Sequence, residues 1–352
     1  MENTDKEKQT QNLEDTPLLN ELVSAYKANM SPEEKLDNDI ELVDIDSIKY
    51  ETSSITDQRN SITSIFNAKP SYQVVCAQSG YMAKVTSMVY KDIVAIMNSN
   101  LSTYESKKET YKILYSKIAG YSAEKWAPSF EEWLDMTSYG DVETLFYGLY
   151  CATFQNTSSI KFRCPTCGKI ATIDVDNSQL VSVNDRKDML EYTKTISKEA
   201  DTLEHIKEYS MVINNKNNVK YIKLPKSKII FGVKIPSLKK VLNDYKTNSE
   251  EALANASEDA EQILLYTDSV SIPNSNGSYS KIETKEDILP LINLLDIEEM
   301  ALLNRLVTKL VSEKKISYGV KKAKCSECQA VIDNIPLDME SLLFFQISEK
   351  RL

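Results

Sequence analysis

Four cysteines in two CxxC pairs are the residues of this sequence best placed to do chemistry. The first pair, Cys164 and Cys167, lies in the segment FRCPTCGK, and the second pair, Cys325 and Cys328, lies in KCSECQ. Two thiolates three residues apart can bind one metal ion from a tight turn whose N–H groups point at the sulfurs. Gly168 supplies the positive φ that such a turn tends to need. The pattern predicts one structural Zn²⁺ ion bound by all four cysteines.

The segments around the cysteines predict how they are positioned. A strand-compatible stretch precedes each pair, and strand patterns follow at Ile170–Val175 and Ala330–Ile335. This arrangement is typical of a zinc ribbon, in which two hairpin knuckles share a tetrahedral site. The two pairs are 325 − 164 = 161 residues apart, so the ribbon is split by a long insertion. The alternative is a redox CxxC, but that motif places its first cysteine at the start of a helix.

The remaining chemistry of the sequence is sparse. A zinc ion with four sulfur ligands has no open position for water or substrate, so its role is predicted to be structural. The single histidine, His205, leaves histidine-based triads and HExxH proteases without partners, and it is expected to face solvent. Cys76 and Cys151 lie in apolar contexts and are expected to be ordinary buried thiols. We therefore predict no catalytic residues, no bound organic cofactor and no enzyme activity.

The cysteine pairs have basic flanks, formed by Lys161, Arg163, Lys169, Lys314, Lys315, Lys321, Lys322 and Lys324. One interpretation is contact with nucleic acid or an acidic partner. The other is that lysines offset the net negative charge of a zinc ion bound by four thiolates. The formal charge of −10 and the pI near 5.0 argue against a general nucleic-acid binder. We therefore favour the second interpretation.

Length and composition set the broad class of the protein. The chain has 352 residues, of which 41% are hydrophobic and 27% charged, which predicts about two domains. No signal peptide is visible at the start, and no apolar run is long enough to span a membrane. Six cysteines in such a chain indicate a reducing compartment.

The predicted fold class is α+β and mostly helical, with four parts. Residues 1–70 are expected to form a mobile acidic arm, which either orders on a partner or stays a solvated tail. Residues 71–158 are expected to form a helical domain. Residues 159–180 and 315–345 are expected to form the split zinc ribbon, and 181–314 an inserted α+β subdomain.

The helical part is predicted from apolar stripes and capping signals. A first helical stripe runs through Met82, Val85, Val89, Ile93, Ile96 and Met97. A second stripe, Tyr111, Leu114, Tyr115 and Ile118, is expected to end at a Gly120 cap. Ser129 and Glu132 form a capping box, and Asp141 is expected to cap a buried helix carrying Leu145, Phe146, Leu149 and Tyr150.

The insertion alternates between strand and helix signals. Residues 183–208 predict a polar helical stretch, and 219–235 predict two strands around a Pro-Lys-Ser turn. Helices are expected after Pro236 and at about 250–265, with a turn at 272–280. Two helices are expected within 285–312, the second capped by Asp296.

The end of the chain resembles a known protein family. Cys325-Ser326-Glu327-Cys328 is followed by a short strand, the turn Pro336-Leu337-Asp338 and the aromatic ending Leu342-Leu343-Phe344-Phe345. This succession resembles the baseplate hub subunits and hub assembly proteins of contractile-tailed phages of the T-even kind. The stretches 222–242 and 128–154 fit the same resemblance, although Gln329 stands where glycine is expected.

The resemblance implies a structural, non-enzymatic subunit or assembly factor of a phage-tail baseplate hub. Its implied partners are other baseplate, hub or tail proteins in a larger assembly, and its implied location is the virion, after synthesis in the host cytoplasm. The alternative is a zinc-ribbon nucleic-acid-binding or transcription accessory protein, which the basic flanks would serve.

Overall fold

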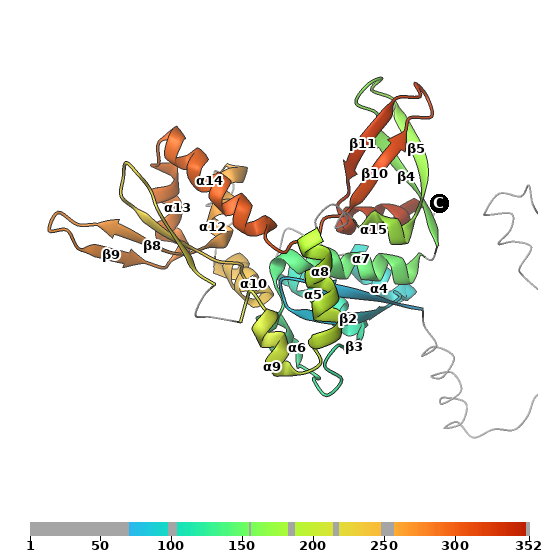
Figure 1. Cartoon of the computed structure of the whole chain (residues 1–352), viewed down its shortest axis with the longest axis horizontal. Helices are drawn as coiled ribbons and strands as arrows, with labels where there is room; N and C mark the ends of the chain where they lie inside the picture. The colour runs from blue at the N-terminus through green and yellow to red at the C-terminus, as the bar shows by residue number, and fades with distance from the viewer. Residues whose placement is uncertain are drawn as a thin grey trace, which may run out of the picture. The chain divides into compact units, whose positions relative to one another are not determined.

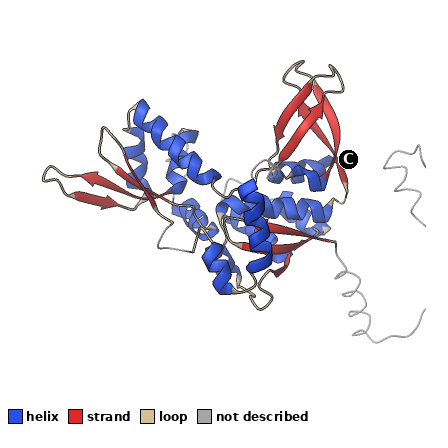
Figure 2. Ribbon diagram, in the orientation of Figure 1, coloured by secondary structure: helices blue, strands red, loops and turns tan. Residues whose placement is uncertain are grey.

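The structure is a computed structural model that describes residues 70–97, 104–154, 156–181, 187–213, 218–247 and 257–349. These residues belong to one compact unit and combine helices with small antiparallel sheets (Figures 1 and 2). The predicted mixed α+β class is confirmed. The predicted acidic arm, apart from residue 70, lies outside the described residues, so its two interpretations stay predictions.

The first sheet corrects the helical prediction for the start of the described region. Strands β1 (Ser71–Cys76) and β2 (Tyr81–Thr86) form an antiparallel hairpin, and β3 (Ile118–Tyr121) extends it. Met82 and Val85 therefore lie on a strand, where Val85 is buried and Met82 half-buried. On a strand, residues three apart lie on opposite faces, which is why Val85 is buried while Met82 is only half-buried. Helix starts only at α4 (Tyr90–Met97).

The helices after this hairpin follow the sequence signals in part. Helix α5 spans Tyr104–Lys117, but the predicted cap Gly120 lies inside strand β3, so that prediction is wrong. Helix α6 (Phe130–Met136) starts with the predicted capping box, in which the N–H of Glu132 donates to Ser129 Oγ at 3.3 Å. Helix α7 (Val142–Thr153) is buried along almost its whole length, which confirms it as a core helix. It packs on β1 and β2 in a first apolar core.

A second apolar core lies under a four-stranded sheet, in the order β6 (Lys220–Lys223), β7 (Ile230–Val233), β8 (Thr267–Pro273), β9 (Tyr279–Ile282). One face of this sheet contacts α12 (Glu258–Tyr266), α13 (Lys285–Asn293) and α14 (Ile297–Ser312) through Phe231 and Val270. The predicted strand pair at 219–235, the turn at 272–280 and the Asp296 cap are confirmed. Glu299 N–H donates to Asp296 Oδ1 at 2.8 Å.

The segment between the cysteine pairs contributes to both cores. The predicted polar helical stretch forms two helices, α8 (Lys187–Glu199) and α9 (Leu203–Tyr209), and α10 (Leu238–Thr247) follows Pro236 as predicted. Ile196, Ile206 and Leu238 are fully buried in the first core, with α7 and the β1–β2 hairpin. The domain boundaries of the sequence analysis stay a prediction, but this insertion packs partly against the segment that precedes it.

A buried polar network joins the β1–β2 turn to the start of α7. Asp141 does not cap α7 with its side chain as predicted, because its carboxylate accepts from Ser79 N at 2.6 Å and Ser79 Oγ at 2.7 Å. Ser138 N in turn donates to Ser79 Oγ at 2.8 Å. Gln78 Nε2 donates to the carbonyl of Val311, at the end of α14, at 3.0 Å. The network therefore links the two cores through groups with almost no solvent contact.

Stability is expected to depend on pH through Asp141. Burial raises its pKa to about 6, even though the hydroxyl and N–H of Ser79 and the N–H of Gln78 lower it. At a pH between the two pKa values, the folded state therefore keeps the Asp141 carboxyl group protonated, whereas the unfolded state has lost that proton. The contribution of Asp141 is therefore greatest below pH ~4 and falls by about 3 kcal/mol as the pH rises to ~6.

Chemical denaturation between pH 4 and 7 measures this contribution as the difference between wild type and Asp141→Asn. Asp333→Asn, at an exposed strand position, is the matched control and is expected to leave the pH profile unchanged. Parallel pH profiles for wild type and Asp141→Asn would contradict the prediction.

Candidate metal centre

Two β-hairpins carry the cysteine pairs. Strands β4 (Thr157–Arg163) and β5 (Ile170–Asp176) form the first hairpin, and β10 (Gly319–Lys324) and β11 (Val331–Pro336) form the second. Their registers pair Arg163 with Ile170 and Lys324 with Val331, so each CxxC falls in the connecting loop. The two hairpins lie side by side, with their loops at the same end (Figure 1).

The two loops have the same backbone geometry. Cys164 N–H donates to Lys169 O at 2.8 Å, and Cys325 N–H donates to Ala330 O at 2.9 Å. Gly168 closes the first loop at φ +72°, and Gln329 closes the second at φ +61°. Glutamine adopts this conformation at a cost that glycine avoids, but its Nε2 donates to Ser326 O at 3.1 Å. The departure from glycine at position 329 therefore leaves the loop shape unchanged.

The four sulfurs meet at one point. All of them lie within 4.8 Å of one another, with Cys164 Sγ at 3.7 Å from Cys328 Sγ and Cys167 Sγ at 3.9 Å from Cys325 Sγ. A tetrahedron with metal–sulfur bonds of ~2.3 Å has edges of about 3.8 Å, whereas a disulfide has a sulfur–sulfur distance of ~2.05 Å. The spacing fits four ligands around one metal ion, so these cysteines could hold one.

Burial differs between the two cysteines of each pair. Cys164 and Cys325 are fully buried, and they pack with Ala171, Phe162 and Ile332 in a small apolar cluster. Cys167 and Cys328 lie nearer to solvent. An ion held here would therefore be sealed on the hairpin side and shielded from water on the other side mainly by its own ligands.

Charge at the cluster is unevenly distributed. The N–H groups of Cys167 and Thr166 lower the pKa of the Cys164 thiol to about 6, against the opposing effect of its desolvation. The N–H of Ala330 lowers the pKa of Cys328, but desolvation and the three neighbouring thiols together outweigh it and raise that pKa to about 12. A bound cation would favour the thiolate form of all four cysteines and release the remaining protons.

Several of the basic flanking residues are engaged within the chain. Lys169 Nζ lies 3.1 Å from Glu327 Oε2 and so links the two loops across the site. Lys315 Nζ lies 3.5 Å from Glu143 Oε2, and Lys314 Nζ stacks over the Tyr192 ring at 4.0 Å. At least three of the eight basic flanking residues are therefore engaged within the chain.

The other sequence expectations for single residues are confirmed. Cys76 and Cys151 are buried thiols outside the cluster. His205 is exposed, and its hydrogen bond with Asp201 raises its pKa.

The C-terminal helix connects the hairpins to the first core. Asp338 starts α15 (Met339–Glu349), since its Oδ1 accepts from Ser341 N at 2.7 Å. The Phe344 ring packs edge-on against Phe146 of α7, with centroids 6.5 Å apart. The Pro-Leu-Asp turn and the aromatic ending are thus a helix start and a core contact.

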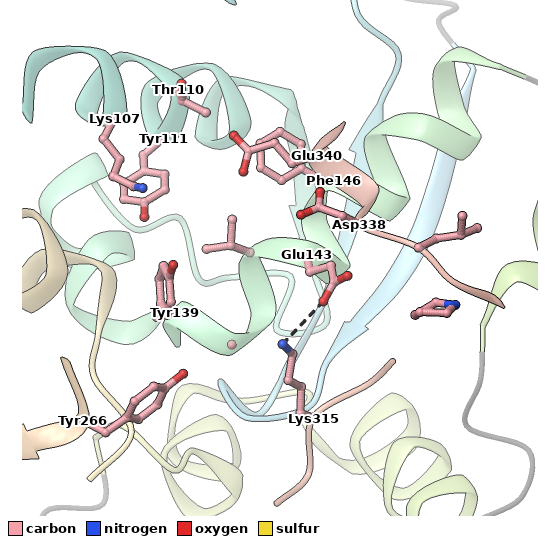
Figure 3. Close-up of a pocket in the computed structure, with 14 residues that line it drawn as sticks. Lys107, Thr110, Tyr111, Tyr139, Glu143, Phe146, Tyr266, Lys315, Asp338 and Glu340 are labelled. Carbon is pink, nitrogen blue, oxygen red and sulfur yellow. Dashed lines mark ion pairs between the residues drawn. The ribbon is translucent and has the colours of Figure 1, made fainter. Parts of the chain in front are cut away.

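A cavity that the sequence did not reveal lies where α5, α7 and the start of α15 meet (Figure 3). It has a volume of about 550 Å³, and its wall includes the Glu143–Lys315 ion pair, Lys107, Asp338 and Glu340. Burial raises the pKa of both glutamates, so they stay protonated to a higher pH than exposed carboxyls. These residues come from distant segments and share no motif, which is why sequence reasoning missed them.

Comparisons with known proteins add no relatives to these observations: no family model, curated protein or solved structure matches the chain. Within the part of the chain that the structure describes, no helix combines the length and the apolar character that crossing a membrane requires.

Replacement of Gly168 by alanine is expected to destabilise the folded protein by about 1–2 kcal/mol, because a Cβ is strained at its positive φ. A Cβ at this position would contact nothing within 4 Å, so the cost comes from the backbone alone. Gly120→Ala is the matched control, since its Cβ also meets nothing within 4 Å and its φ is not positive. Denaturant unfolding of both variants measures the difference, and equal losses would contradict the knuckle geometry.

Proposed function

We propose that the four cysteines bind one structural Zn²⁺ ion as a split zinc ribbon. Four thiolates in a tetrahedral arrangement select zinc or iron among the common metals. The paired hairpin loops, the 3.7 Å and 3.9 Å sulfur separations and the two fully buried cysteines support a closed four-ligand site. A closed site leaves no position for substrate, so the metal supports the fold and takes no part in catalysis.

The proposed ion acts as a cross-link over a very long stretch of chain. It joins Cys164 to Cys325, and a loop of 325 − 164 = 161 residues closed by a covalent cross-link would gain about 5 kcal/mol from loop entropy. The segment 168–324, which contains the whole second core, then starts and ends at one point. The ribbon fixes where this segment leaves and rejoins the first core.

We propose further that the protein is a non-enzymatic structural subunit or assembly factor of a contractile phage-tail baseplate hub, and that it acts through contacts with other hub or tail proteins. The observation that carries this proposal is the resemblance of the segments 128–154 and 325–345 to that family. Contact between these two segments supports it, since Phe344 packs on Phe146 and the Asp338-capped α15 lies against α7. The resembling stretches therefore form one connected part of the molecule.

The alternative, a zinc-ribbon protein that binds nucleic acid, has less support. Contacts with Glu327, Glu143 and Tyr192 already engage Lys169, Lys315 and Lys314. The formal charge of −10 also opposes binding to a polyanion.

Metal analysis of the purified protein tests the zinc proposal. We expect about one zinc per chain in the wild type and loss of stoichiometric zinc in Cys164→Ser and Cys325→Ser, because three ligands hold the ion far less tightly. Cys151→Ser is the matched control, since Cys151 is a buried thiol outside the cluster. Iron in place of zinc, or zinc retained by both ligand variants, would contradict the proposal.

Mass spectrometry of purified virions and of tail-assembly intermediates tests the baseplate proposal. The chain is expected in one of the two, together with hub or tail components, because a subunit or assembly factor must be present where the hub is built. A free monomer that is absent from both, or a salt-sensitive complex with DNA or RNA, would overturn it.

A further inference from the structure

An aromatic groove lies beside β3, an edge strand of the first sheet. It has a volume of about 540 Å³, and its walls come from the end of α5, from β3 and from the loop that leads to α6. Tyr115, Tyr121 and Trp126 supply its rings, one from each of these three segments. A Cβ on Gly120 of β3 would meet nothing within 4 Å, so the space beside the strand is open. The groove is therefore accessible to another molecule.

Hydrogen bonds and ring contacts hold the walls of the groove in place. Trp126 N–H donates to Ala123 O at 2.9 Å. Tyr115 Oη donates to Pro128 O at 2.6 Å, which attaches the same loop to α5. The Tyr121 and Trp126 rings have centroids 4.5 Å apart and planes at 54°, so neither ring fully covers the face of the other. The groove is therefore formed before a ligand binds, which lowers the entropy cost of binding.

Glu124 gives the groove its charge. It is exposed, and it is the one charged residue among the described residues that line the groove. Within the described part of the chain, its carboxylate takes part in no ion pair and no hydrogen bond. The faces of aromatic rings are electron-rich and also attract cations. A carboxylate beside three rings therefore favours a cationic group over a neutral or anionic one.

Strand β3 offers main-chain groups to a peptide that lies in the groove. Among the described residues it pairs with β2 alone, in a three-stranded sheet. Ser122 N–H donates to Met82 O at 2.8 Å, so Ser122 faces β2. Since bonded positions alternate along an antiparallel pair, the N–H and C=O of Tyr121 point away from β2. The Tyr121 N–H can bind an acceptor, which a peptide carbonyl supplies and a free cation lacks.

We propose that this groove binds an arginine side chain carried by a segment of a partner protein. The guanidinium lies against the Tyr121 and Trp126 rings and opposite the Glu124 carboxylate. Arginine fits this combination better than lysine, because its planar guanidinium stacks on aromatic faces and can pair with a carboxylate through two N–H groups. The main chain of the segment pairs with the outward N–H and C=O of Tyr121.

Charge favours a basic partner over a segment of this chain. Acidic residues outnumber basic ones in residues 1–70, so this stretch is poorly matched to a groove whose one charge is negative. The formal charge of −10 on the whole chain likewise attracts a basic protein. The inference depends on α5, β3 and the loop after β3, and it holds whether or not the protein belongs to a baseplate.

Titration of the full-length protein with the capped peptide Ser-Gly-Arg-Gly-Ser tests the proposal. The chain has two tryptophans, so the indole N–H region of its NMR spectrum reports on the half-buried Trp126 and the fully buried Trp133. The variant Trp126→Phe assigns the two signals. We expect a saturable shift of the Trp126 signal. The Trp133 signal is expected to shift far less, because its Nε1 donates to Tyr81 Oη at 3.2 Å inside the core, and it reports an intact fold.

Matched ligands separate the contributions to binding. A peptide with citrulline in place of arginine keeps the shape of the side chain without its charge, and it is expected to bind at least about tenfold more weakly. A lysine peptide keeps the charge without the planar group, and it is expected to bind at least about threefold more weakly. Methylguanidinium is a free cation and is expected to bind at least about tenfold more weakly than the arginine peptide. Any of these three ligands binding as tightly as the arginine peptide would overturn the proposal.

The variant Glu124→Gln tests the carboxylate and is expected to weaken binding of the arginine peptide at least about threefold. Glu204→Gln, at an exposed position of α9, is the matched control and is expected to leave binding unchanged. Unchanged binding by Glu124→Gln, or no saturable shift of the Trp126 signal up to about 10 mM peptide, would contradict the inference. Neither outcome bears on the zinc or baseplate proposals, which metal analysis and virion analysis test separately.

Discussion

The meeting of four thiols from two hairpins 161 residues apart is the constraint on which the rest of the structure depends. Four thiols at about 4 Å from one another, with two of them fully buried, are costly to ionise all together without a cation. A metal ion bound to all four would remove this cost and join the two hairpins into one unit. Because the chain between them contains the second core, the site fixes both ends of that core at the same place.

The two cores are also joined directly, by a network that is polar and buried. Gln78 spans the junction, since its side chain donates to the Val311 carbonyl while its neighbour Ser79 holds Asp141. Buried polar groups that all have partners favour one relative placement of the elements that they join. Asp141 makes this network sensitive to pH, because burial disfavours its ionised carboxylate and raises its pKa. The connection between the cores is thus specific in geometry and sensitive to protonation.

Local signals predicted many of the elements, and they failed where packing overrode them. The capping box at Ser129 and the cap at Asp296 were predicted correctly, because each depends on residues three apart in the chain. The stripe from Met82 was interpreted as helix because its three- and four-residue steps match the helical period, but pairing of β2 with β1 and β3 makes its first part a strand. Asp141 was predicted to cap helix α7 with its side chain. Its carboxylate instead accepts hydrogen bonds from the N–H and the hydroxyl of Ser79, which lies close to it in the fold.

The sequence by itself predicted which four cysteines come together at the candidate metal centre. Two CxxC pairs between strand patterns allow few other arrangements, because the knuckle is a local turn whose geometry follows from its own residues. Tertiary structure alone decided the partners of that turn: which thiols face each other, the placement of α15 on α7, and the cavity formed by α5, α7 and α15. These features depend on contacts between residues far apart in the chain, and no local pattern records which distant segment fills a given space.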